Sequence, residues 1–408
     1  MPAATPGTPS LLRAMNDRAA LELLLTHGPL SRTRIGHLTG LSKPTASQLL
    51  ARLEAAGLVL ATGTDEGRPG PNAQLYELNP RAAYVGALDV TPERVLAAVA
   101  DLTGTIVGGF ALPYTEGTEA VAQVTGALDG ALAAAGLGLT DLRRLVIATP
   151  GAFDPRTGRL RYASHLPGWH SPTLLDELAT ALPLPVEYEN DVNLAAVAEQ
   201  RLGAARGHED FVLLWNEEGL GAALVLGGRL HRGWTGGAGE VGFLPVPGHP
   251  LVRQVTRANS GGYQELAGVQ VLPALAAGLG VEAPPADPGE AAATSAGAEV
   301  AAGVALLRRA ADRPEGAHLR FLHSYATLLA TGLASLVSVL DPEIVVLSGA
   351  VITAGGEPLR ALLETELAEL APSRPRLVTG EVVDRPVLRG ALESALATTR
   401  EEVFDTSR

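Results

Sequence analysis

Residues 28–79 decide the fold of the N-terminal part of this chain: GPLSRTRIGHLTGLSKPTASQLLARLEAAGLVLATGTDEGRPGPNAQLYELN. Ser31 and Ser42 each stand before a short segment whose apolar residues recur at helical spacing. Serine is a favoured N-cap, because its hydroxyl accepts a hydrogen bond from a backbone N–H in the first turn. Pro44 falls in the first turn of the second segment, where proline is tolerated. The pattern predicts two helices separated by a turn around Leu41.

A further helix is expected before this pair, capped by Asn16 and continuing through Thr26, with Gly28 as its stop. Apolar residues on one face of each helix are expected to point into a shared core. They are Leu21, Leu24 and Leu25 in the first helix, Ile35 and Leu38 in the second, and Ala46, Leu49, Leu50 and Leu53 in the third.

The opposite face of the third helix is polar, and a hairpin is expected directly after it. Its strands are predicted at residues 58–61 and 74–78, joined by a stiff loop that carries Arg68. Three helices followed by such a wing are typical of a winged helix-turn-helix, which places one helix in the major groove of DNA. An exposed wing arginine suits the narrow minor groove of A·T-rich DNA. The predicted DNA contacts are Lys43, Thr45, Ser47, Gln48, Arg52 and Arg68.

The alternative for this module is an ordinary three-helix bundle with a polar face, which the adjoining hairpin disfavours. For Arg68 the alternative is a loop arginine without a function. The charge of the chain confines any DNA contact to this module, because residues 1–80 hold seven Lys or Arg and six acids and carry +1. The whole chain carries −13, so the remaining residues carry −14 and would repel phosphates.

The 408 residues are too many for one ordinary core, so two or three domains are expected. No cysteine is present, which excludes disulfides, thiolate metal sites and a cysteine nucleophile. No apolar run approaches the roughly 18 residues of a membrane span. Residues 1–10 lack the charged and apolar regions of a signal peptide. These features predict a cytoplasmic protein without a membrane partner.

From residue 83 onward, strand and helix patterns alternate in two similar α/β halves, a pattern that fits an actin-like ATPase with a cleft between two lobes. The predicted elements of the first half are strands at 83–89, 94–101 and 105–114, a helix at 118–136 and a strand at 145–148. Those of the second half are strands at 211–215, 221–226 and 229–231, a helix at 318–340 and a strand at 344–347. Residues 281–316, rich in Ala, Pro, Gly and Glu, are expected to form an extended loop followed by a helix, without an assigned function.

Four motifs occur in order along this body: LPGWHSPTLLDEL, ENDVNLAAVAE, GLGAALVLGGRLHRGWTGGAGEVG and VVLSGAV. Together they resemble the ROK family of repressors and sugar kinases, and LSKPTASQLLARLEAAGLV with its GRPG wing is similar to the repressor branch. The resemblance covers nearly the whole chain. It implies a winged helix-turn-helix at 1–80, a first α/β lobe at 81–192 and a second at 193–408, whose C-terminal helix can return to the first lobe.

The resemblance also implies a sugar site. Asn190 and Asp191 match the ND pair of the family, in which the aspartate of the kinases is the general base toward a sugar hydroxyl. Glu240 matches the glutamate of the E-x-G-H motif, and Glu265 matches a second sugar-contacting glutamate. Carboxylates and an amide can hold the hydroxyls of a pyranose in a fixed pattern. A purely structural role is the alternative for each of these residues.

Three departures from the family pattern limit what the resemblance implies. Phe243 replaces the histidine of E-x-G-H, which serves the sugar and a structural zinc, and the zinc cysteines are absent, so no metal is expected. The D-x-G-G-T phosphate loop reads Asp89-Val90-Thr91-Pro92-Glu93 and contains no glycine. The second phosphate loop carries Glu217 and Glu218. Neither loop favours ATP, so no cofactor and no catalytic residues are predicted.

The sequence therefore predicts a non-enzymatic transcriptional regulator, most simply a repressor, that binds operator DNA and responds to a sugar or sugar derivative. A homodimer or higher homo-oligomer is expected, because one helix and one wing supply few phosphate contacts. Two alternatives stay open at this point. One is a sugar kinase that has retained a DNA-binding domain, and the other is a regulator whose cleft is vestigial.

Overall fold

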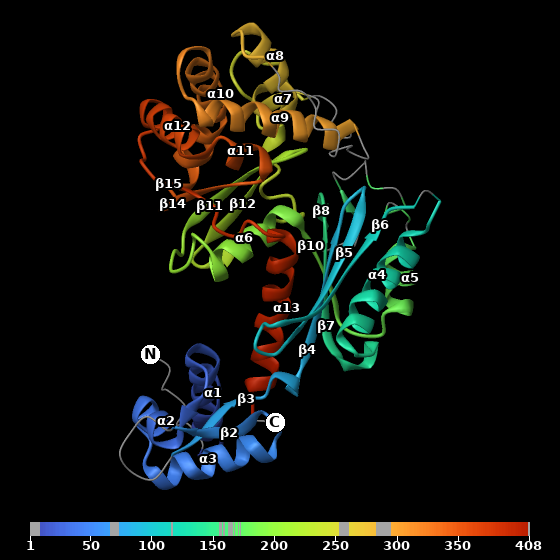
Figure 1. Cartoon of the computed structure of the whole chain (residues 1–408), viewed down its shortest axis with the longest axis vertical. Helices are drawn as coiled ribbons and strands as arrows, with labels where there is room; N and C mark the ends of the chain where they lie inside the picture. Colours follow the sequence, from blue (N-terminus) through green and yellow to red (C-terminus); the bar gives the residue numbers. More distant parts are fainter. Residues whose placement is uncertain are drawn as a thin grey trace.

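The computed structural model in Figure 1 places a small N-terminal module at one end of the chain and two α/β lobes beyond it. It describes residues 9–65, 73–115, 117–154, 157, 160–161, 166, 168–169, 171, 173–252, 261–282 and 295–406. Arg68, which the sequence predicts in the wing loop, lies outside the described residues.

The N-terminal module is a winged helix-turn-helix, as predicted. Its elements are α1 (Pro9–His27), β1 (Leu30–Ser31), α2 (Arg32–Thr39), α3 (Lys43–Ala55), β2 (Val59–Asp65) and β3 (Ala73–Leu78), with the strands in the order β1-β3-β2. Both serine caps are confirmed, because Ser31 Oγ accepts from the N–H of Arg34 at 3.3 Å and Ser42 Oγ from that of Thr45 at 3.4 Å.

Two details of the module were predicted wrongly. Asn16 does not cap α1, because the helix already begins at Pro9 and Asn16 lies in its interior. Adding one more residue to an existing helix costs little, and Leu11, Leu12 and Ala14 are good helix formers, so nothing stops the helix at Asn16. Leu38 does not point into the core either, since its side chain is 37% exposed. The other expected core residues are buried or packed against the core of the module.

The first lobe is built on a five-stranded sheet in the order β10-β7-β4-β5-β6. Strands β4, β5 and β6 form an antiparallel meander, and β7 and β10 add to β4 in parallel. The elements are η1 (Pro80–Ala82), β4 (Tyr84–Val90), β5 (Arg94–Asp101), β6 (Ile106–Pro113), α4 (Ala120–Ala135), η2 (Leu139–Asp141), β7 (Leu142–Thr149), β8 (Ala152–Phe153), β9 (Leu160–Arg161), α5 (Leu174–Ala181), β10 (Val186–Asn190) and α6 (Asp191–Leu202).

The second lobe repeats this topology in the sheet β13-β12-β11-β14-β15. Strands β11, β12 and β13 again form an antiparallel meander, and β14 and β15 again extend it in parallel. The prediction of two similar halves is therefore confirmed. The elements are β11 (Phe211–Asn216), β12 (Leu220–Leu226), β13 (Arg229–Leu230), η3 (Val241–Phe243), α7 (Gly262–Ala267), η4 (Val269–Val271), α8 (Leu272–Gly278), α9 (Ser295–Asp312), α10 (Gly316–Leu340), β14 (Ile344–Ser348), α11 (Ala350–Ala354), α12 (Gly356–Leu370) and β15 (Arg376–Thr379). The last helix, α13 (Pro386–Phe404), follows β15 and returns to the first lobe.

Helix α10 corrects the expectation about membrane spans, because its length and apolar composition are sufficient to cross a bilayer. It is also a core element of the second lobe. Phe321, Tyr325 and Leu329 are fully buried there, and nearly half of its apolar stretch lies inside the protein. A buried core helix passes the same length and composition test as a membrane helix.

Helix α13 links the body to the N-terminal module, and Figure 1 shows it running from the region of α6 toward β3 and α1. It packs along α6 and against β4 and β7. The contact with α6 needs Gly390, since a Cβ at this position would lie 1.8 Å from the Leu194 carbonyl oxygen. At the other end of the helix, Phe404 is 2% exposed and belongs to the core of the N-terminal module.

Candidate DNA interface and ligand cleft

Helix α3 presents its polar face to solvent, while Ala46, Leu49, Leu50 and Leu53 are buried on the other face. Lys43, Thr45 and Gln48 are exposed, and Ser47 is half-buried. Thr45 Oγ1 lies 2.7 Å from Ser42 Oγ, so its hydroxyl is held at the N-terminus of the helix. This face has the position and the chemistry of a recognition helix.

Arg52 differs from the other predicted contacts, because it is already paired within the module. Its Nη2 lies 2.6 Å from Asp17 Oδ1 on α1, and the arginine side chain is 43% exposed. Asp17 is buried and also accepts a hydrogen bond from the Thr406 hydroxyl at 3.2 Å. Arg52 therefore ties α3 to α1, and reaching a phosphate would break this pair.

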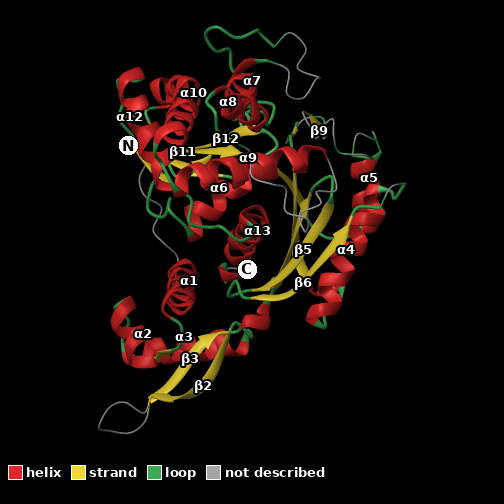
Figure 2. Ribbon diagram, turned by 45° about the horizontal axis from the view of Figure 1, so that its top comes forward, coloured by secondary structure: helices red, strands yellow, loops and turns green. Residues whose placement is uncertain are grey.

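Arg32 was not among the predicted DNA contacts, but it lies next to α3. Arg32 Nη1 donates to Ser47 Oγ at 3.0 Å, so α2 brings a guanidinium group to the exposed side of α3. The sequence offered one signal for Arg32: Arg34 follows it in the first turn of the same helix, so two arginines stand close together there. The hairpin of β2 and β3 extends away from the helices in Figure 2.

The second candidate site lies where β10 of the first lobe passes into α6. Asn190 caps α6, since its Oδ1 accepts from the N–H of Asn193 at 3.1 Å. Its Nδ2 donates to the Gly151 carbonyl at 3.0 Å and to Asp191 Oδ1 at 2.9 Å. The N–H of Val192 donates to the same Asp191 oxygen at 2.8 Å. These bonds fix the orientation of the ND pair.

Four carboxylates from both lobes lie close enough in this cleft to interact. Burial, together with the neighbouring Asp89, Glu240 and Glu217, raises the pKa of Asp191 to about 8. Burial also raises the pKa of Glu240 to about 7, that of Glu217 to about 7 and that of Asp89 to about 6. At neutral pH the cleft therefore holds protonated carboxyl groups, which can donate as well as accept hydrogen bonds.

Glu265 is the predicted site residue that the structure does not bring into this group. It is exposed on α7 and is not among the carboxylates that raise the pKa of Asp191. Its neighbour Gln264 is buried instead, and its Oε1 accepts from the N–H of Leu220 at 2.6 Å. Phe243, at the end of η3, follows Glu240 and is half-buried.

The first phosphate loop is replaced by a closed turn between β4 and β5. The N–H of Thr91 donates to the Arg94 carbonyl at 2.9 Å, and the N–H of Arg94 donates to Thr91 Oγ1 at 3.3 Å. Pro92 has no N–H. Two backbone donors of this turn are therefore already used, and Pro92 supplies none to cradle a phosphate.

The second phosphate loop is occupied by the chain itself. Glu217 Oε1 accepts from the N–H of Ala350, the first residue of α11, at 3.1 Å. A helix N-terminus is where backbone N–H groups would meet an anionic ligand, and here a carboxylate takes that place. Gly349, before α11, has φ 89°, and a Cβ there would lie 2.6 Å from the Asn216 carbonyl oxygen.

An ion pair between the lobes was also missed by the sequence analysis. Arg232, after β13, donates from Nε to Glu189 Oε2 on β10. Glu189 Oε1 accepts from Asn193 Nδ2 at 2.8 Å, so the pair joins the loop that leads to Glu240 with the start of α6. Among the described residues, no group of three His, Asp or Glu side chains could hold a metal ion. The expectation of no zinc stays a prediction.

The ROK family matches residues 85–398, and the MarR family matches residues 16–68. The chain belongs to the ROK family. Its MarR-like winged helix makes it a DNA-binding transcriptional regulator of that family. The xylose repressor of Bacillus subtilis (strain 168) is 23% identical over 247 residues, 58% of this chain and 62% of the repressor. The match thus spans about three fifths of that relative.

Two solved structures are similar to this ROK protein in fold. A ROK family transcriptional regulator, a homologue of the E. coli MLC protein, has a TM-score of 0.71 at 18% identity and covers 97% of this chain and 99% of its own. A ROK hexokinase from Thermus thermophilus has a TM-score of 0.60 at 27% identity and covers 78% of this chain and 99% of its own. Of these two, the regulator accounts for the winged helix and the body together.

Proposed function

We propose that this ROK protein is a transcriptional repressor whose operator binding responds to a sugar or sugar derivative held in the cleft. The observation that carries the proposal is the contrast between the two sides of the cleft. On the sugar side, hydrogen bonds orient the half-buried Asn190 and Asp191, and Glu240 lies close enough to raise the pKa of Asp191. On the phosphate side, the turn at Thr91 and the Glu217 carboxylate fill the places that ATP would need.

The sugar is held by the polar groups that converge between the lobes. Asn190 supplies an amide, and Asp191 and Glu240 supply carboxyl groups that act as donors or acceptors according to their protonation. Glu265 stays a candidate on sequence grounds alone, because it is exposed on α7 and lies outside this group. Phe243 offers an apolar face in place of a histidine, which favours a deoxy or modified sugar.

DNA binding is assigned to Lys43, Thr45, Ser47 and Gln48 on α3 and to Arg68 on the wing. Arg52 contacts DNA only if its ion pair with Asp17 opens. Arg32 joins them through its contact with Ser47. A homodimer supplies the second recognition helix that a two-fold operator requires. The protein acts in the cytoplasm, where the chromosome is.

The proposal is tested by selecting DNA sites from a random pool with the purified protein and titrating the enriched site with a panel of pentoses, hexoses and amino sugars. One sugar is expected to change operator affinity by about fivefold or more. Asp191→Asn should abolish this response and leave sugar-free DNA binding unchanged. Asp384→Asn, at an exposed position before α13, is the matched control.

Two outcomes would overturn the proposal. Turnover of ATP with any sugar, lost in Asp191→Asn, would make the protein a kinase. DNA binding that no sugar changes, together with no sugar binding by calorimetry, would make the cleft vestigial.

A further inference from the structure

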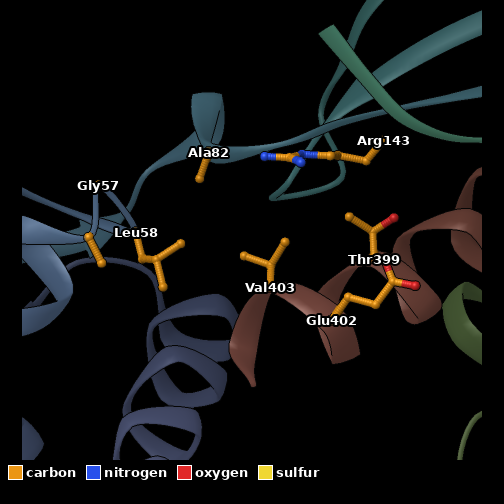
Figure 3. Close-up of a pocket in the computed structure, with 8 residues that line it drawn as sticks. Gly57, Leu58, Ala82, Arg143, Thr399, Glu402 and Val403 are labelled. Carbon is orange, nitrogen blue, oxygen red and sulfur yellow. The ribbon is translucent and has the colours of Figure 1, made fainter. Parts of the chain in front are cut away.

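A cavity of about 360 Å³ lies between the N-terminal module and the body, away from the cleft. Its wall is formed by both parts of the chain (Figure 3). The residues that line it are Ala56, Gly57, Leu58, Ala82, Arg143, Thr399, Glu402 and Val403. Cavities of this size at domain boundaries are common places for small ligands to bind.

The charged groups of the wall favour an anion. Glu402 is ion-paired, because its Oε1 lies 2.6 Å from Nη2 of Arg144, and the same guanidinium group also pairs with Glu187 at 2.6 Å. Arg143 is the next residue on β7, and Figure 3 shows its guanidinium group reaching over the cavity toward Ala82. The side chain of Arg143 has no hydrogen-bond or ion-pair partner among the residues that the structure describes. Arg143 is exposed, and its guanidinium group is therefore the cationic group of the wall that can reach an anion in the cavity.

The rest of the wall suits the carbon skeleton of a small molecule. Leu58 and Val403 supply apolar surface, and a Cβ added to Gly57 would have no atom within 4 Å, which marks open space. Thr399 is fully buried, and its hydroxyl has no hydrogen-bond partner.

We propose that this cavity is a second effector site, which binds a small organic anion through Arg143 and thereby sets the position of the DNA-binding module on the body. The anionic group is a phosphate ester or a carboxylate. Because the turn after α3, Ala82 and α13 all contribute to the wall, the anion binds best to one arrangement of the module and the body. A ligand with such a preference must change DNA affinity, and DNA must change its affinity in return. The site is distinct from the sugar cleft and does not depend on it.

The test uses the full-length protein and four probes at constant ionic strength: a hexose 6-phosphate, the same hexose, succinate and inorganic phosphate. Calorimetry is expected to show binding of the phosphate ester or of succinate, and the comparison of these two identifies the anionic group. Arg143→Gln should weaken that binding by about tenfold or more, because a charge-assisted hydrogen bond is lost. Arg206→Gln, an exposed arginine away from the cavity, is the matched control and should bind like the wild type.

Two further measurements separate this site from the cleft. The anion should change operator affinity in the wild type and in Glu240→Gln, but not in Arg143→Gln, while sugar binding should be lost in Glu240→Gln alone. The proposal is overturned if no probe binds below about 10 mM. It is equally overturned if Arg143→Gln binds the anion as tightly as Arg206→Gln, or if bound anion leaves operator affinity unchanged.

Discussion

Asp191 is half-buried at the start of α6, close to the carboxyl groups of Asp89, Glu217 and Glu240. Burial and the nearby carboxylates raise its pKa to about 8, far above the value of about 4 for an aspartate in an unfolded chain. The folded protein therefore binds more protons than the unfolded chain between these two values. The stability linked to Asp191 is fully present below about pH 4 and is lost as the pH rises through about 8.

The first prediction follows from this linkage. The free energy of unfolding should fall between pH 5 and pH 8.5, and Asp191→Asn should flatten this dependence and stabilise the protein at pH 8.5 by about 1 kcal/mol or more. Urea denaturation of both proteins at several pH values measures the difference. Asp384→Asn, an exposed control, should reproduce the wild-type curve. A stability that rises from pH 5 to pH 8.5 would contradict the assignment of a buried, proton-binding Asp191.

A second prediction concerns the exposed face of α3 and the wing. Gln48→Ala should relax base preference at one operator position by roughly 1–3 kcal/mol, because a glutamine amide can read a base edge. Arg68→Ala should weaken binding mainly at A·T-rich sites. Lys43→Ala should instead weaken binding to all sequences and lower its salt dependence. Anisotropy titrations on the selected operator and on single-base variants distinguish these effects. Wild-type affinity of all three variants across salt concentrations would show that this face does not contact DNA.

At the scale of secondary-structure elements, α13 is the part of the body that completes the DNA-binding module. Its last turn places Phe404 among Leu21, Leu24 and Leu53 in the core of the module. The residues of this core are separated by most of the chain length. The module is therefore not independent of the body, although its sequence pattern is local.

The third prediction tests this dependence. Phe404→Ala should cost about 3–5 kcal/mol in the stability of the module, because it leaves a cavity in a buried core. DNA affinity should fall strongly, while sugar binding in the distant cleft should be retained. Val383→Ala, at a site 82% exposed before α13, is the control and should change neither. Thermal unfolding, anisotropy and calorimetry on the two variants give the three readouts. Unchanged DNA binding in Phe404→Ala would mean that the module folds without the end of α13.

Most elements could be predicted because their signals are local. Ser31 and Ser42 cap the helices they precede, and the apolar strands predicted for both lobes occur within a few residues of their predicted bounds. Asn16 could not be placed correctly, because a good N-cap residue is also tolerated inside a helix whose preceding residues favour it. The prediction that Leu38 is buried was wrong for a different reason. An eight-residue helix such as α2 buries only the part of its apolar face that neighbouring elements cover.

For the whole molecule, the decisive question is whether the body still transfers phosphate. Phosphoryl transfer depends mainly on positioning and on stabilising charge around the γ-phosphate. In the turn at Thr91, the N–H groups of Thr91 and Arg94 already donate within the turn, and Glu217 and Glu218 place two carboxyl groups with raised pKa values on the other side. A retained base such as Asp191 would contribute only about 10²–10⁴-fold, which does not compensate for a missing phosphate site.

The fourth prediction is therefore that the protein releases no ADP from magnesium-ATP with any hexose above the background rate. A coupled assay measures this directly. Pro92→Gly combined with Glu217→Gln restores some of the features of a phosphate loop and should raise nucleotide affinity measurably. ADP release that depends on Asp191 in the wild-type protein would contradict the prediction.

The sequence by itself determined the winged helix-turn-helix, the two similar α/β halves and the loss of the phosphate glycines, because each of these depends on residues close together in the chain. The tertiary structure alone decided which side chains meet. It paired Arg52 with Asp17, brought Arg232 to Glu189 across the lobes, left Glu265 exposed and put Phe404 into the core of the N-terminal module. Such contacts join residues far apart in the chain, and they arise only when packing fixes the position of each element against its neighbours, which no local pattern encodes.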